Sequence, residues 1–169
     1  TQLPTSEAKA TILLSLGNTH RAIGNQLRDR QSPPKYDYMP WRCEEEPQAI
    51  SDDILKAYQQ ADLAYLQIIR EYQPSTTRTL AQINHLSLLS EVGEKLATNS
   101  ATEIEFDRLP SSRAKVYAEI KVAKSQACLS QLTGGSPNWQ ETAQKLEFAA
   151  KEAEKIGDRF AQSFALGNL

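Results

Sequence analysis

The stretch AAKEAEKIGDRFAQSFALGNL (residues 149–169) holds the end of one helix, a turn and the start of another. Small and apolar residues recur at helical spacing up to Ile156. Gly157 suits the helix end because glycine readily adopts a left-handed conformation, and the Asp158 side chain can cap the helix that follows. A near echo of the final residues, LLSLGNT, lies at residues 13–19. We therefore expect helices joined by tight turns, arranged as an internal repeat.

The rest of the chain has the same helical character. No segment alternates apolar and polar residues as a half-buried strand does. In the second expected helix one apolar stripe is formed by Ile54, Ala57, Tyr58, Ala61, Tyr65, Ile68 and Ile69. The pattern predicts helices at 6–27, 51–72, 76–93, 111–132, 138–156 and from 158 onward. Ser136 is expected to cap the 138–156 helix, with Pro137 in its first turn.

A seventh helix is inferred from the order of the others. Helices stacked in antiparallel pairs alternate in direction, yet 76–93 and 111–132 both have the pattern of the first helix of a pair. A second helix is then needed between them. Ser100 and Glu103 can form a capping box there, and Pro110 can stop the helix. We predict a short, degenerate helix within 100–110.

Two segments of the first half have the features of a known repeat. LLSLGNTHRAIGN (residues 13–25) resembles the first helix of a tetratricopeptide (TPR) repeat, in which Gly17 allows a partner helix to approach closely. Gly24 lies where such helices often end. The spacing of Tyr58, Ala61, Tyr65 and Ile68 resembles the pattern in the partner helix of such a repeat. The stretch at 149–169 likewise resembles the junction between two TPR repeats.

The resemblance extends to a particular group of proteins. AQINHLSLLSEVG (81–93), LPSSRAKVYAEIKVAKSQACL (109–129) and IGDRFAQSFALGNL (156–169) together resemble TPR regions of large bacterial proteins that end in a CHAT domain, a caspase-like cysteine-protease fold. This resemblance implies an all-α, right-handed α-solenoid of antiparallel TPR-like helix pairs with about three and a half repeats. It also implies a single array over 1–169 with an inserted loop at 28–50 and a half repeat at 158–169. We expect the chain to be a fragment of a longer protein.

Composition and motifs argue against several classes of function. The formal net charge is −2 and there is no long basic run, so nucleic-acid binding is not expected. The sequence contains no membrane span. Cys43 and Cys128 are too few for a disulfide framework; one disulfide is the alternative, but we expect two unrelated thiols. No pair of cysteine or histidine residues has metal-ligand spacing, and no motif places a nucleophile beside a base. We expect no catalytic residues, no metal and no cofactor.

The expected binding surface is the concave groove that the first helix of each pair lines in such arrays. The residues predicted to face it are Leu14, Asn18, Arg21, Ile83, Ser87, Glu91, Lys121 and Lys124. Asn18 with Arg21 resembles part of the way some TPR proteins clamp a peptide carboxylate. Burial or plain solvation is the competing interpretation for each residue. In the 28–50 loop, Tyr36, Tyr38 and Trp41 are candidate anchors, unless they fold back and cover the stack.

These observations predict a non-enzymatic scaffold that binds a protein or peptide. The resemblance implies that one partner could be a CHAT domain of the same parent chain. The alternative is a regulatory segment that senses a signal and gates a CHAT-type cysteine protease in that parent. Self-association through the open C-terminal half repeat is a further expectation. The expected location is the cytoplasm.

Overall fold

The structure is a computed structural model that describes residues 7–31, 50–92 and 104–169. Helices are the only regular secondary structure among these residues, which contain no strand, so the all-α prediction is confirmed for them. A short 3-10 turn, η2 (Phe106–Arg108), precedes α4. The α-helices are α1 (Glu7–Gln31), α2 (Asp52–Glu71), α3 (Thr76–Val92), α4 (Arg113–Leu132), α5 (Trp139–Lys155) and α6 (Arg159–Leu166).

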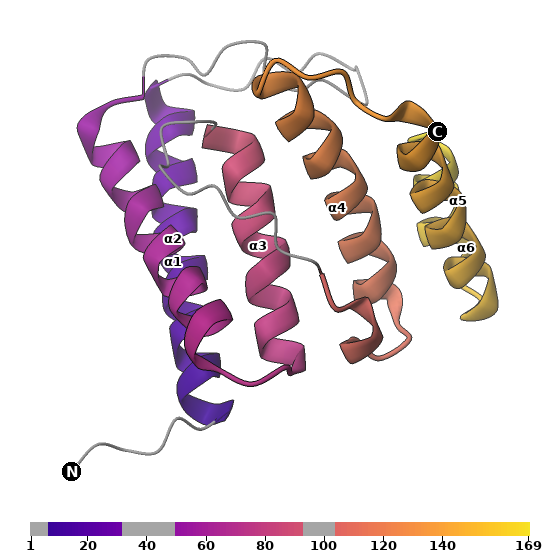
Figure 1. Ribbon diagram of the computed structural model, residues 1–169, viewed down its shortest axis with the longest axis horizontal. Helices are drawn as coiled ribbons and strands as arrows, with labels where there is room; N and C mark the ends of the chain where they lie inside the picture. Colours follow the sequence, from indigo (N-terminus) through magenta and orange to yellow (C-terminus); the bar gives the residue numbers. More distant parts are fainter. Residues whose placement is uncertain (1–6, 32–49, 93–103) are drawn as a thin grey trace.

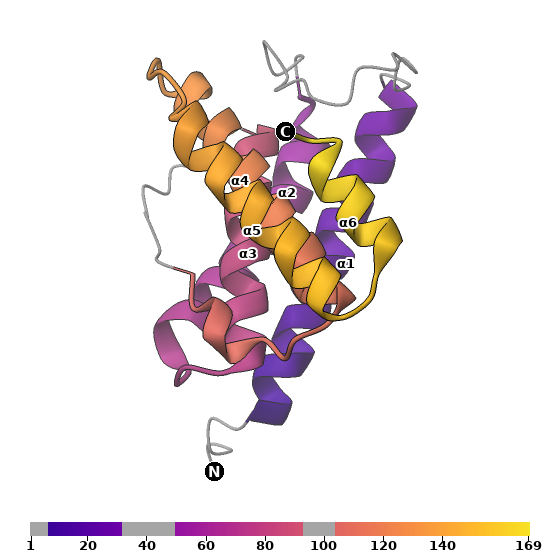
Figure 2. The ribbon, with the colours of Figure 1, turned by 90° about the vertical axis from the view of Figure 1, so that its right-hand side faces the viewer.

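The helices lie side by side in a row, each against the next in the chain (Figure 1). α1, α3, α4 and α6 run in one direction, whereas α2 and α5 run in the opposite direction (Figure 1). A quarter turn shows that α1 and α6, from opposite ends of the row, lie on the same side of the molecule (Figure 2). In addition, α1 contacts α3 and α4 contacts α6. Helices that run in the same direction are therefore in contact with one another, α1 with α3, α3 with α4 and α4 with α6.

Two glycines of α1 explain how closely it packs on α2. A Cβ added to Gly17 would lie 2.6 Å from Cε1 of Tyr65, and one added to Gly24 would lie 2.5 Å from Cε1 of Tyr58. Both tyrosine rings are fully buried. α1 continues to Gln31, past the predicted end at residue 27, so Gly24 lies within the helix. Gly24 instead makes the same kind of close helix contact as Gly17, one heptad further along.

The other predicted helices differ from the structure mainly at their ends. Gly157 ends α5 with φ +70°, and the Asp158 side chain accepts a hydrogen bond from Ala161 N at 3.0 Å, as expected. The predicted cap of α5 is wrong, because Asn138 rather than Ser136 accepts from Glu141 N. The two sides of α4 join different clusters, one with α5 and α6 and one with α3.

The connection between α3 and α4 departs from the predicted alternation of helices. In the described part of 100–110, η2 is the only helical turn, so the predicted helix is not present there; residues 93–103 lie outside the described part. Consequently α3 and α4 are parallel neighbours in direct contact (Figure 1). Leu109 lies in the interface between α3 and α4, where it is buried together with Ile83 and Val122. Hydrogen bonds from Thr76 Oγ1 and Thr79 Oγ1 to backbone carbonyls hold the connection on α3.

The expectation of two unrelated thiols is wrong. Cys128 in α4 is disulfide-bonded, and the chain contains one other cysteine, Cys43, which lies outside the described residues. Disulfides are characteristic of oxidising compartments, so this bond gives no support to the expected cytoplasmic location. Among the helices of the described part, none has the length and apolar character to cross a bilayer.

Candidate functional site

A chain of hydrogen-bonded polar side chains links the parallel helices α1, α3 and α4. We call it the polar seam. Its members from α1 are Asn18 and Arg21, its members from α3 are Asn84, Ser87 and Glu91, and its member from α4 is Lys121.

Arg21 forms the α1 to α3 half of the seam. Its guanidinium donates to Ser87 Oγ at 2.7 Å and pairs with the Glu91 carboxylate. The Ser87 hydroxyl also donates to the same Glu91 oxygen. Because the Arg21 and Glu91 side chains are only partly exposed, this pair is held in place more firmly than a solvated surface pair.

Asn84 is the hub of the other half. Its Nδ2 donates to Asn18 Oδ1 at 2.9 Å, and its Oδ1 accepts from Lys121 Nζ at 3.3 Å. The Tyr65 hydroxyl of α2 donates to the same Asn18 oxygen at 2.8 Å. Burial raises the pKa of Tyr65 to about 12, so this hydroxyl keeps its proton at any physiological pH. The three parallel helices are thereby linked by side-chain amides as well as by charges.

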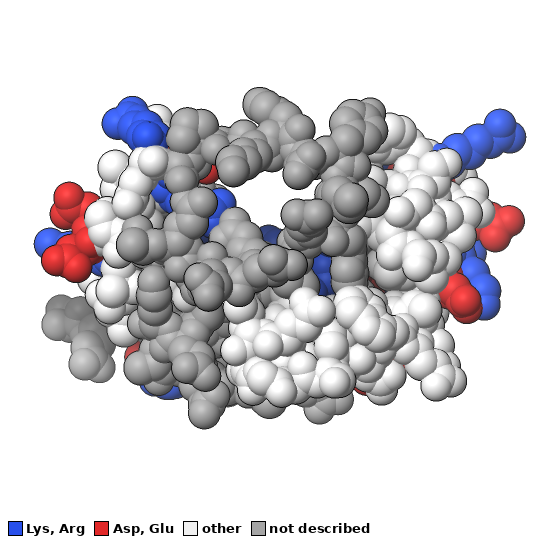
Figure 3. Space-filling view, turned by 90° about the horizontal axis from the view of Figure 1, so that it is seen from above, with Lys and Arg blue, Asp and Glu red and all other residues white. Residues whose placement is uncertain are grey.

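Among the described residues, the charged side chains of the polar seam are two cations, Arg21 and Lys121, and one anion, Glu91. Lys124 lies about one turn beyond Lys121 on α4. Burial and then the positive charge of Arg21 lower the pKa of Lys121 to about 8, and burial also lowers the pKa of Lys124. Seen from above, a few Lys and Arg atoms are visible near the middle of the molecule (Figure 3).

The structure separates the predicted groove residues into two groups. Asn18, Arg21, Ser87, Glu91 and Lys121 come together in the polar seam, with Lys124 next to it. Leu14 and Ile83 are instead buried in the hydrophobic core. The loop candidates Tyr36, Tyr38 and Trp41 lie outside the described residues.

Sequence reasoning missed Asn84, the hub of the seam. The signal that could have found it is its spacing, because Asn84, Ser87 and Glu91 follow one face of a helix at intervals of three and four residues. Ile83 was placed on that face instead. A shift of one residue turns a side chain by about 100° around the helix axis, which is the difference between core and seam.

Two buried polar groups lie away from the seam. His85 Nδ1 is 2.7 Å from Asp62 Oδ1, and this pair joins α3 to α2 inside the core. Glu119 in α4 is 5% exposed, and neither of its carboxylate oxygens has a hydrogen-bond partner within the described part of the chain. Burial raises the pKa of Glu119 to about 7. Cys128, the cysteine of the described part, is disulfide-bonded and therefore offers no free thiol as a nucleophile to the His85–Asp62 pair or to Glu119.

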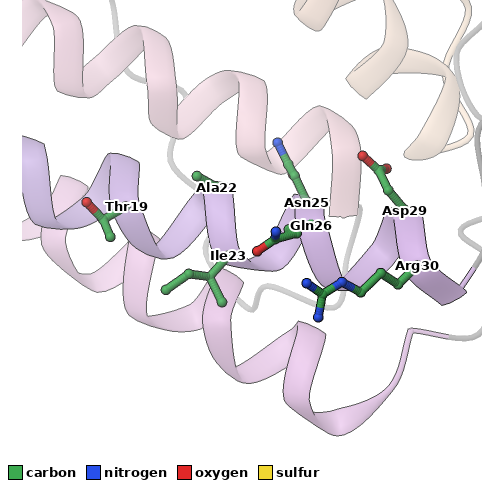
Figure 4. A pocket seen from close by; sticks show the side chains of 7 residues that line it. All are labelled: Thr19, Ala22, Ile23, Asn25, Gln26, Asp29 and Arg30. Carbon is green, nitrogen blue, oxygen red and sulfur yellow. The ribbon is translucent and has the colours of Figure 1, made fainter.

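A depression of about 710 Å³ lies along α1, with Thr19, Ile23 and Arg30 among its lining residues (Figure 4). All of its described lining residues come from this single helix. One helix cannot enclose a ligand, so this depression adds nothing to the candidate site. No group of three or more His, Cys, Asp or Glu residues suited to a metal ion occurs within 7–31, 50–92 and 104–169.

Comparison with known proteins provides no family for this chain. No family model matches it, and neither a curated protein nor a solved structure matches it. The geometry of the polar seam is therefore the basis for a functional proposal.

Proposed function

We propose that this protein is a TPR-like interaction scaffold that binds a peptide or protein segment along the polar seam. In this proposal the row of helices is part of a right-handed α-solenoid of about three and a half repeats, in which the connection between α3 and α4 replaces one second helix. The common direction of α1, α3, α4 and α6 supports this arrangement (Figure 1). Helices that share a direction and a side form the ligand-facing wall in such arrays.

The observation that supports the proposal is the charge of the polar seam, where Arg21 and Lys121 lie with one carboxylate, Glu91, among the described residues. Burial lowers the pKa of Lys121 and of Lys124, because withdrawing an ammonium group from water costs free energy. A peptide with acidic side chains would offset that cost at Lys121 by placing a carboxylate beside it. Asn18, which is exposed on the same side, offers amide hydrogen bonds to an extended backbone.

A peptide library displayed on phage tests this proposal. We expect selection on the purified chain to enrich acidic peptides. Fluorescence polarisation with a synthetic enriched peptide should show at least ten-fold weaker binding to Lys124→Glu, because a site cation is replaced by an anion. Glu147→Lys, on the exposed face of α5, is the matched control and should bind like the wild type.

Asn18→Ala gives an independent measurement. It removes the shared acceptor of Tyr65 and Asn84, and we expect several-fold weaker peptide binding without loss of helical circular dichroism. Enriched peptides that bind Lys124→Glu and the wild type equally well would place the binding surface elsewhere and refute the proposal.

A further inference from the structure

Two aromatic rings lie next to the polar seam, and we call them the aromatic pair. The ring of Tyr117 in α4 and the ring of Phe164 in α6 have centroids 5.3 Å apart and are tilted by 45°. Tyr117 lies four residues before Lys121, so the two side chains follow the same face of α4, one turn apart. Side-chain contacts between the parallel helices therefore continue from the polar seam to α6.

The aromatic pair is only partly covered by the rest of the protein. Phe164 is 42% exposed, and Tyr117 is half-buried against the apolar cluster that α4 forms with α5 and α6. Aromatic side chains are enriched among the residues that contribute most to the free energy of binding. The pair is therefore suited to an apolar side chain of a binding partner.

A cation lies one turn from Tyr117 on either side of it along α4, Arg113 before it and Lys121 after it. Arg113 is paired with the carboxylate of Asp158. Lys121 instead donates its hydrogen bond to a neutral group, the side-chain amide oxygen of Asn84, at 3.3 Å. Of these two cations, Lys121 is therefore the one that an acidic partner would approach.

The surroundings of Lys121 leave room for such an interaction in terms of hydrogen bonding and charge. An ammonium group has three N–H donors, and within the described part of the chain Asn84 accepts from one of them. The carboxylate of the polar seam, Glu91, is paired with Arg21. A carboxylate supplied by a partner would thus meet both a hydrogen-bond donor and a complementary charge at Lys121.

The distance between the two contacts suits an extended peptide. Four helical residues rise by about 6 Å, and side chains two positions apart in an extended chain lie on the same side, about 6.6 Å apart. We propose that the chain recognises an extended peptide in which an apolar residue lies two positions from an aspartate or glutamate. The carboxylate binds Lys121, and the apolar side chain packs on the aromatic pair. This inference rests on the proposed function and adds a second contact and a spacing to it.

A spacing series of synthetic peptides tests the proposal. Decapeptides of serine and glycine carry one glutamate and one phenylalanine, separated by one to four positions, in both orders. Titrations of the full nitrogen-15-labelled chain, followed by NMR, measure weak affinities of this kind. We expect the tightest binding at a separation of two, at least five-fold tighter than at one or three, because at odd separations the two side chains point to opposite sides.

Two variants assign the contacts. Phe164→Ser should weaken binding of the best peptide at least five-fold and leave the affinity for its phenylalanine-to-serine analogue unchanged. Phe148→Ser is the matched control, because Phe148 is 52% exposed on α5, and it should bind every peptide like the wild type. Lys121→Gln should lose the preference for glutamate over glutamine in the peptide but keep the preference for phenylalanine. Circular dichroism confirms that each variant is folded.

The outcomes separate this inference from the proposed function. Peptides that need glutamate but bind equally well at every separation, or with serine in place of phenylalanine, would overturn the inference and leave the proposed function standing. Tighter binding to Phe164→Ser than to the wild type would also overturn it, since a second copy of the chain would then be what covers the aromatic pair. Indifference to glutamate in every peptide would refute the proposed function and the inference together.

Discussion

At the scale of single residues, the protein places three ionisable groups in partly or fully dry surroundings. Lys121 and Lys124 are partly buried on α4, and Glu119 is buried on the same helix. Desolvation is the first cause of the changed pKa for all three. Burial favours the neutral form of each group, which raises the pKa of the carboxyl group and lowers the pKa of the two amines.

Glu119 makes the stability of the fold depend on pH. Burial raises its pKa from 4.5 to about 7, so the folded state retains a proton that the unfolded state releases at lower pH. The contribution of this proton to the free energy of unfolding is fully present below the unfolded-state pKa and is lost as the pH rises through the folded-state pKa. The free energy of unfolding falls by on the order of 3 kcal/mol over this range.

We therefore expect Glu119→Gln to be more stable than the wild type at pH of about 8, by up to roughly 3 kcal/mol, with little difference at pH of about 4.5. Urea unfolding followed by circular dichroism at several pH values measures this. Glu147→Gln, on an exposed position of α5, should leave the pH profile unchanged. Parallel profiles for Glu119→Gln and the wild type would show that Glu119 does not titrate in this range.

At the scale of helices, the close contact of α1 and α2 depends on the missing side chains at Gly17 and Gly24. Each faces a tyrosine ring that has no exposed surface. Intrinsic propensity would favour alanine over glycine within a helix by about 1 kcal/mol. Overpacking of a buried site costs about 1–3 kcal/mol, and a ring that is enclosed on all sides has little room to move. We conclude that packing outweighs propensity here.

Gly17→Ala should consequently lower the free energy of unfolding by about 1–2 kcal/mol, although alanine is the better helix former. Chemical denaturation of the purified variant measures the change. The penalty should shrink in a Tyr65→Leu background, because the ring atoms within 3 Å of the added Cβ are then gone. An equal penalty in both backgrounds would mean that the Tyr65 ring is not what excludes a side chain at position 17.

The α3 to α4 connection shows what local sequence signals can and cannot predict. Ser100, Glu103 and Pro110 predicted a helix, yet only η2 forms in the described part of that stretch. A capping signal has an effect only if the residues that follow bury an apolar stripe. Here Leu109 and the partly buried Phe106 cover the apolar interface between α3 and α4 without forming an α-helix.

At the scale of the whole molecule, apolar side chains remain exposed at both ends of the row. On α6, Phe160 is 70% exposed and Phe164 is 42% exposed. On α1, Ile12 is 68% exposed. A helix of an array normally buries such side chains against its next neighbour, so these faces are suited to contacts with another copy of the chain.

Self-association through α6 is the corresponding prediction. Sedimentation equilibrium at increasing concentration should detect dimers of the wild type and mainly monomers of Phe160→Ser. Ile12→Ser, a substitution of comparable exposure at the other end of the row, should retain the dimer. Dimers that persist in Phe160→Ser but disappear in Ile12→Ser would instead assign the contact to α1.

The sequence by itself determined the elements of this protein. Periodicity, caps and turn residues predicted the helices because these signals act within one or two turns of the chain, and Gly157 with Asp158 ended one helix and began the next as expected. Only the tertiary structure decided which residues join the polar seam. The rotation of each helix against its neighbours placed Leu14 and Ile83 in the core and made Asn84 the link to Lys121. That rotation depends on side chains far apart in the sequence, which no local pattern contains.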